Sequence, residues 1–166
     1  VLLVPRFSDI KSRKEVNLSS HLGKDLKLNI PIISSPMDTL TEGEMARAMD
    51  EVGGLGIVHR YCTTAKQCNI VQQSIVLSKL FNTNYEPLVG AAIGATGDFK
   101  ERACALVEAG ARVICIDIAH GHHVLMERAL KTLKDIYGKN VHLMAGNVAT
   151  LEGFNDLADW GADSIR

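Results

Sequence analysis

The chain has 166 residues, the usual size of one domain, and 46% of them are hydrophobic, which is enough for a substantial core. Its formal net charge is −1, with acidic and basic residues interspersed, so we expect neither a disordered chain nor a surface for nucleic acid. No apolar run is long enough to span a membrane, and the four cysteines form no CxxC pair, so we expect a reduced, cytoplasmic protein that does not bind membranes.

The start of the chain differs in character from the remainder. Residues 1–5 are a short apolar piece and residues 6–27 are polar and mixed, and we interpret 1–27 as an N-terminal arm with little regular structure. The first strand is predicted at 28–34, and a loop comes next at 35–38.

Two capping-box patterns indicate the helices that come after the first two strands. Thr41 with Glu44, and Thr64 with Gln67, each place a hydroxyl three residues before an acidic or amide side chain. The second of these helices is predicted to run to about Leu80. We expect the first to pack inward through apolar residues at helical spacing, namely Met45, Met49 and Val52.

The rest of the chain repeats one unit of strand, loop, helix and glycine. Further strands are predicted at 55–58, 88–93, 113–116 and 141–145, and a sixth begins at Ser164. Asp98 and Thr150 are the predicted caps of two intervening helices, and a third helix ends at Tyr137. Such repetition gives a parallel sheet with right-handed crossovers, which both a doubly wound sheet and a (β/α)8 barrel would satisfy.

Polar or glycine-rich segments come after the predicted strands, at the end where parallel α/β folds bind ligands. They are 34–38, 59–60, 94–98, 117–123 and 146–147. Asp117 comes directly after a buried apolar run, where an unpaired carboxylate would be costly. It is either an acceptor facing a ligand or a capping residue that binds loop amides. No GxGxxG sequence comes after the first strand, which disfavours a Rossmann dinucleotide site.

Several residues have a functional and a structural interpretation. His120, His122 and His123 have a spacing that zinc can use, but no cysteine or carboxylate motif surrounds them, so we predict no metal site. Cys115 lies within an apolar strand and is expected to be a buried, inert thiol. Arg60 could bind phosphate or could be a solvated residue at the end of a strand.

Five motifs resemble, in the same order, those of the inosine-5′-monophosphate (IMP) dehydrogenase and GMP reductase family. They are IISSPMDTLTE (32–42), GGLGIVH (53–59), VGAAIGATGD (89–98), DIAHGH (117–122) and AGNVAT (145–150). The resemblance covers nearly the whole chain. SSPMDT and VGAAIGATGD look closer to the dehydrogenase than to the reductase.

The resemblance implies an α/β fold of the (β/α)8 TIM-barrel type, with about the first five to six βα units in this chain, usually assembled as a homotetramer. It also implies the reaction of IMP, NAD and water to give XMP and NADH through a covalent cysteine intermediate. By motif match, the residues expected to contact the substrate nucleotide are Ser35, Met37 and Asn147. Those expected to contact NAD are Asp117, Ile118, Ala119 and His59.

The chain also departs from the family pattern. The short polar connection at 81–86 leaves no room for the paired regulatory CBS module that many relatives carry. The family's catalytic cysteine loop and potassium site would come after Arg166, so we expect no catalytic residue within 1–166 and the C-terminal half of the barrel to be missing. Two alternatives remain: a GMP reductase that uses NADPH, and a non-catalytic partial barrel that needs a partner chain.

Overall fold

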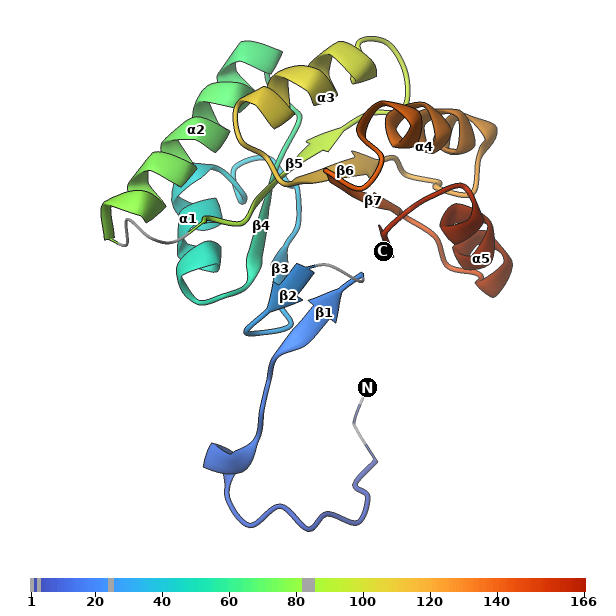
Figure 1. Cartoon of the computed structure of the whole chain (residues 1–166). Helices are drawn as coiled ribbons and strands as arrows, with labels where there is room; N and C mark the ends of the chain where they lie inside the picture. Colours follow the sequence, from blue (N-terminus) through green and yellow to red (C-terminus); the bar gives the residue numbers. More distant parts are fainter. Residues whose placement is uncertain (1, 3, 24–25, 82–85) are drawn as a thin grey trace.

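The computed structural model describes residues 2, 4–23, 26–81 and 86–166. Part of the predicted arm and most of the 81–86 connection lie outside these residues. Figure 1 shows a curled sheet with helices on its outer side and the N-terminal segment extending away from it. The six strands of this sheet are β3 (Ile33–Ser34), β4 (Leu55–Val58), β5 (Val89–Ile93), β6 (Val113–Asp117), β7 (His142–Gly146) and β8 (Ser164–Ile165). The helices are α1 (Gly43–Glu51), α2 (Thr64–Phe81), α3 (Phe99–Glu108), α4 (Val124–Tyr137) and α5 (Leu151–Asp159).

Strand order separates the two architectures that the sequence leaves open. All neighbouring strands are parallel, and their order in the sheet is their order in the chain from β3 to β8. A doubly wound sheet would reverse this direction at its switch point. The fold is therefore part of a (β/α)8 barrel, as the family resemblance implies.

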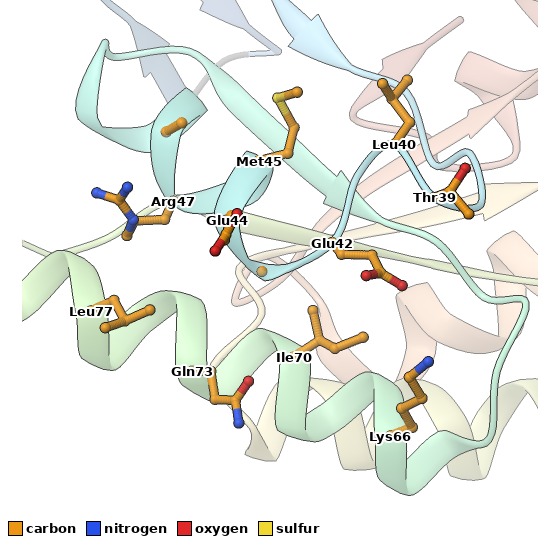
Figure 2. Close-up of a pocket in the computed structure, with 12 residues that line it drawn as sticks. Thr39, Leu40, Glu42, Glu44, Met45, Arg47, Lys66, Ile70, Gln73 and Leu77 are labelled. Carbon is orange, nitrogen blue, oxygen red and sulfur yellow. The ribbon is translucent and has the colours of Figure 1, made fainter.

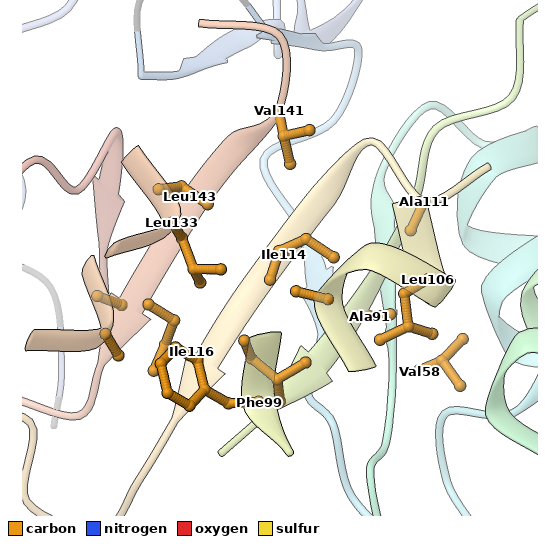
Figure 3. Close-up of a cluster of buried hydrophobic side chains, with 14 of the residues drawn as sticks. Val58, Ala91, Phe99, Leu106, Ala111, Ile114, Ile116, Leu133, Val141 and Leu143 are labelled. Carbon is orange, nitrogen blue, oxygen red and sulfur yellow. The ribbon is translucent and has the colours of Figure 1, made fainter. Parts of the chain in front are cut away.

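The two faces of the sheet pack against different partners, because successive side chains of a strand point to opposite faces. On the outer face, Val58, Ile114 and Leu143 pack with helical residues such as Leu106 and Leu133 (Figure 3). The inner face forms a second apolar cluster that includes Leu55, Ile57, Ala92, Val113, Cys115 and Met144. Burial on both faces explains why these strands read as continuous apolar runs.

The predicted arm is partly structured, so the interpretation of 1–27 as irregular is wrong at its C-terminal end. A 3-10 helix covers Arg13–Glu15, and β1 (Ser20–Leu22) pairs antiparallel with β2 (Leu26–Leu28). Leu26 and Leu28 are buried in the inner-face cluster of the sheet. The hairpin forms because this apolar face offers it a surface, and that surface is built from strands far along the sequence.

The first predicted strand, 28–34, is also too long. Only β3 joins the sheet, because Leu28 belongs to the hairpin and Pro31 offers no N–H for a ladder. The N–H groups of Asn29 and Ile30 instead donate to the Gly53 carbonyl oxygen, at 2.7 and 3.2 Å.

Neither predicted capping box forms. Thr41 is fully buried, and its hydroxyl donates to the Ser35 carbonyl oxygen, while α1 begins at Gly43 without a side-chain cap. Gln67 is fully buried as well, and its Nε2 donates to the carbonyl oxygens of Val58 (3.3 Å) and Ala92 (2.8 Å). Neither side chain bonds to a helix end. Thr150, in contrast, caps α5 as predicted, accepting from the Gly153 N–H.

The residues of α1 that pack against the sheet also differ from those predicted. Met45 and Val52 are exposed, and Ala46 is the fully buried residue that faces β4. A Cβ atom added at Gly56 would come within 2.5 Å of the Ala46 Cα, so the helix and strand are too close here for a large side chain. In the part of the chain that the structure describes, no helix has both the length and the apolar character that crossing a membrane requires.

Candidate functional site

A cavity of about 610 Å³ lies at the carboxyl ends of the strands, within the size range of small-molecule sites. Its lining comes from the segments after β3, β4, β6, β7 and β8: Ser35, Pro36, Met37, Asp38, Arg60, Tyr61, Asp117, Ile118, Ala119, Asn147 and Arg166. Six of the seven predicted contact residues lie here, and His59 is the exception. Loops that are distant in sequence converge at this cavity, because the parallel strands all end at one rim of the sheet.

An ion pair crosses one side of this cavity. Arg166 donates from Nη2 to Asp117 Oδ1 at 2.7 Å and from Nε to Asn147 Oδ1 at 2.8 Å. Within the described residues no loop amide donates to the Asp117 carboxylate, so the capping alternative for this residue is wrong. The arginine holds the carboxylate and the amide in fixed positions at the cavity wall.

The loop after β3 is fixed from below. Ser34 Oγ and the Ser35 carbonyl oxygen both lie within hydrogen-bond distance of the buried Thr41 hydroxyl. The N–H of Thr41 donates to the Met37 carbonyl oxygen at 3.2 Å. These bonds leave the Ser35 and Met37 side chains exposed at the cavity.

His59 differs from the other six residues to which the resemblance assigns a ligand contact. Its side chain is only 1% exposed and does not line the cavity. Nδ1 accepts from the Tyr61 N–H at 3.1 Å, so in the neutral ring Nε2 carries the proton and donates to Glu42 Oε1 at 3.2 Å. His59 thus connects the end of β4 to the loop that carries Ser35 and Met37.

The carboxylates near His59 could in principle form a metal site with it. Asp38, Glu42 and His59 could each offer one ligand atom, and these atoms lie within 4.8 Å of one another. The tautomer argues against such a site, because the His59 Nε2 lone pair is not free while Nδ1 accepts from an amide.

The histidines after β6 have separate structural partners. His122 Nε2 lies 2.7 Å from Asp156 Oδ2, which connects this loop to α5. His123 is the N-cap of α4, and its Nδ1 accepts from the Leu125 N–H. Neither arrangement gathers the histidines around a common point.

None of the four cysteines is an activated nucleophile. Burial raises the pKa of Cys115 to about 12, and burial also raises the pKa of Cys62 and of Cys68. The hydrogen bond to Glu108 raises the pKa of the exposed Cys104. The thiolate is the nucleophilic form, so none of these thiols is suited to covalent catalysis at neutral pH.

Sequence reasoning missed Tyr61 and Arg166 as cavity residues, whereas Pro36 and Asp38 belong to the 34–38 segment that was expected at this end of the sheet. Arg166 directly follows β8, just as Asp117 ends β6. The expectation that residues at the carboxyl ends of strands line the site could therefore have identified Arg166 as well. Tyr61 gave no such signal, because it lies beyond the last residues of its strand.

A larger cavity, of about 790 Å³, lies elsewhere. It is a groove between α1 and α2, lined by Leu40, Met45, Ile70 and Leu77 together with charged residues (Figure 2). It lies mainly between the two helices, although part of the loop after β3 also lines it, and none of the seven predicted contact residues does. We therefore place the candidate site in the smaller cavity.

Comparison with known proteins gives matches over the whole chain. All of residues 1–166 match the family model described as the IMP dehydrogenase / GMP reductase domain. The chain is 36% identical to the inosine-5′-monophosphate dehydrogenase of Cryptosporidium parvum and 28% identical to that of Nitrosopumilus maritimus, and covers 49% and 59% of them. It is 27% identical to the GMP reductase of Leishmania major, of which it covers 59%, and each alignment includes the whole chain. The chain thus spans about half the length of these relatives.

Proposed function

Because the chain belongs to the IMP dehydrogenase / GMP reductase family, we propose that the complete protein is a purine nucleotide oxidoreductase that converts IMP, NAD and water to XMP and NADH. The observation that carries the proposal is the single cavity in which Ser35, Met37, Asp117 and Asn147 meet. These residues come from three of the family-like motifs. The similarity of SSPMDT and VGAAIGATGD to the dehydrogenase favours this reaction over its reductive counterpart.

The residues present fit a dinucleotide. The Asp117 carboxylate, 14% exposed at the cavity wall, is a strong acceptor for ribose hydroxyls. Ile118 and Ala119 beside it give an apolar surface for a flat ring. When bound, NAD would accept the hydride from the purine.

Within the same cavity we assign the substrate nucleotide to Ser35, Met37 and Asn147. Asn147 is kept in place by Arg166, and the 35–38 loop by Thr41. All four cysteines of this chain have raised pKa values, so we assign the attacking cysteine to a part of the protein outside residues 1–166. A potassium ion and a homotetramer would belong to that complete enzyme.

A GMP reductase is the second candidate, favoured by the match to the Leishmania enzyme. The test is a spectrophotometric assay of the complete protein. Formation of NADH with IMP supports the dehydrogenase, whereas oxidation of NADPH with GMP supports the reductase. Neither activity, together with no binding of either nucleotide, would favour the non-catalytic partial barrel.

A further inference from the structure

Three arginines lie around the candidate site, and they differ in how their charge is paired. Arg166 is bonded to Asp117 and Asn147. Arg102 donates to the Cys62 carbonyl oxygen (3.2 Å) and to Gln67 Oε1 (3.0 Å), and its Nε lies 3.5 Å from Asp98. Both of these arginines have structural partners that satisfy their charge.

Arg60 has no such partner. Its Nε is buried and makes no hydrogen bond, and no ion pair joins its guanidinium to a carboxylate of any residue that the structure describes. A buried charged donor without an acceptor is costly, and it is commonly explained by a ligand that completes it.

The surroundings hold the Arg60 side chain in place without satisfying it. The guanidinium carbon lies 5.5 Å from the centre of the Tyr61 ring, a cation–π contact that leaves the N–H groups free. Its Nη1 lies beside the loop after β5, since a Cβ atom at Gly94 would be 3.7 Å away.

This position joins two cavities. Arg60 and Ile118 both line the 610 Å³ cavity, and both also line a neighbouring one of about 150 Å³. The other residues of the smaller cavity are Gly94, Ala95, Thr96, Asp98 and Arg102. Of the residues with an expected ligand only Ile118, on the cofactor side, lines the smaller cavity, so we take this cavity as a continuation of that side.

Three carboxylates line these cavities, and none of them forms an ion pair with Arg60. Asp117 is bonded to Arg166, Asp98 lies 3.5 Å from Arg102, and Asp38 lies 3.7 Å from His59 Nε2. The planar guanidinium therefore retains donors that match the oxygens of a phosphate ester.

We propose that Arg60 binds a phosphate group of the ligand and that this group is the diphosphate of the dinucleotide. The assignment to a dinucleotide rests on the proposed function, whereas the recognition of phosphate rests on the unpaired guanidinium alone. In this arrangement the diphosphate passes Arg60 as the dinucleotide runs from Asp117 over Ile118 toward the 94–98 loop.

The test is a calorimetric titration of the complete protein with NAD, IMP and inorganic pyrophosphate. Arg60→Gln removes the charge, and Arg60→Lys keeps the charge without the planar fork. Arg112→Gln is the matched control, because Arg112 is 45% exposed and lies 4.0 Å from Glu86, just before the start of β6 and so at the opposite end of the sheet. Thermal melts establish that all three variants fold.

We expect Arg60→Gln to raise the Kd for NAD by about tenfold or more and to abolish pyrophosphate binding, with the Kd for IMP changed less than about twofold. The affinity of Arg60→Lys for NAD should lie between those of Arg60→Gln and the unchanged protein. Arg112→Gln should leave the affinities for NAD, pyrophosphate and IMP unchanged. An unchanged Kd for NAD in Arg60→Gln, or a loss confined to IMP, would overturn the assignment to the diphosphate.

The pyrophosphate titration separates this inference from the proposed function. If the complete protein binds neither NAD nor IMP, the proposed function fails, but pyrophosphate binding that depends on Arg60 still supports recognition of phosphate. Pyrophosphate binding that is absent, or that persists in Arg60→Gln, counts against it.

Discussion

At the scale of single residues, Asp117 combines a structural partner with an acceptor that faces the cavity. Its carboxylate is paired with Arg166, yet it still lines the cavity. Arg166 is 28% exposed and keeps its bond to Asn147, so water can hydrate the guanidinium if the carboxylate is removed. A ligand role and a role in folding can therefore be separated at this residue.

We predict that Asp117→Ala in the complete protein raises the Kd for NAD about tenfold or more, because a charged acceptor for the ribose hydroxyls is lost. The free energy of unfolding should fall by less than about 1 kcal/mol, as for a partly exposed ion pair. Titration with NAD and urea unfolding measure the two effects. Asp117→Asn, which retains one acceptor oxygen, should have a smaller effect on NAD. Unchanged NAD affinity in Asp117→Ala would contradict the assigned role.

Cys115 gives a prediction about pH. Burial raises its pKa from an ordinary 9.0 to about 12, so between these values the unfolded chain releases a proton that the folded chain keeps. The contribution of this thiol to the free energy of unfolding is complete below about pH 9. It is lost as the pH rises toward 12, by at most about 1.4 kcal/mol per pH unit. Urea unfolding at about pH 8 to 11 should therefore show a steeper loss of stability in the unchanged protein than in Cys115→Ala. Cys104→Ala, at an exposed site, should keep nearly the slope of the unchanged protein, and equal slopes in all three would exclude this effect.

At the scale of elements, the packing of α1 on β4 depends on two small residues. Ala46 is fully buried opposite Gly56, and the helix backbone leaves no room for a Cβ atom on the strand. This close approach keeps α1 next to the 35–42 loop, which carries the cavity residues Ser35 and Met37.

Gly56→Ala should therefore reduce the free energy of unfolding by about 1–3 kcal/mol, because overpacking moves α1 away from the sheet. Gly43→Ala is the control, since its added Cβ would meet its nearest neighbour at 3.7 Å, in ordinary contact at the start of the helix. Urea unfolding of both variants measures the difference. If Gly56→Ala were as stable as Gly43→Ala, the packing of α1 on β4 would be looser than the structure shows.

At the scale of the whole molecule, the β1–β2 hairpin covers the apolar inner face of the curled sheet. Leu28 is 4% exposed among residues from β4, β5, β6 and β7. The hairpin therefore joins the start of the chain to strands that form much later in the sequence.

We predict that Leu28→Ala lowers the free energy of unfolding by about 2–5 kcal/mol, the usual result of deleting a buried leucine. Lys27→Ala changes the exposed neighbour in the same strand and should alter stability by less than about 0.5 kcal/mol. Urea unfolding compares the two variants. Equal effects would mean that the hairpin does not pack on the sheet in solution.

The sequence alone predicted β4 at its observed bounds, and the other strands of the sheet except β3 to within a residue or two. Buried parallel strands are continuous apolar runs ending in polar residues, which is a local signal. The same signal indicated Ser35, Met37, Asp117 and Asn147 as residues of one rim. It could not reveal that Leu26 and Leu28 are buried, or that Thr41 and Gln67 bond away from helix ends, because these partners lie elsewhere in the chain.

Taken alone, the sequence indicates the family, the alternation of strands and helices, and the set of residues at the strand ends. Which of those residues share a cavity, and which are paired, depends on the three-dimensional fold. Asp117 and Arg166 are 49 positions apart and bonded, His59 lies outside the cavity lining, and the buried Arg60 Nε has no hydrogen-bond partner among the described residues. The reason is physical: the period of a strand fixes which face a side chain takes, but only the curvature of the completed sheet brings the ends of different strands together.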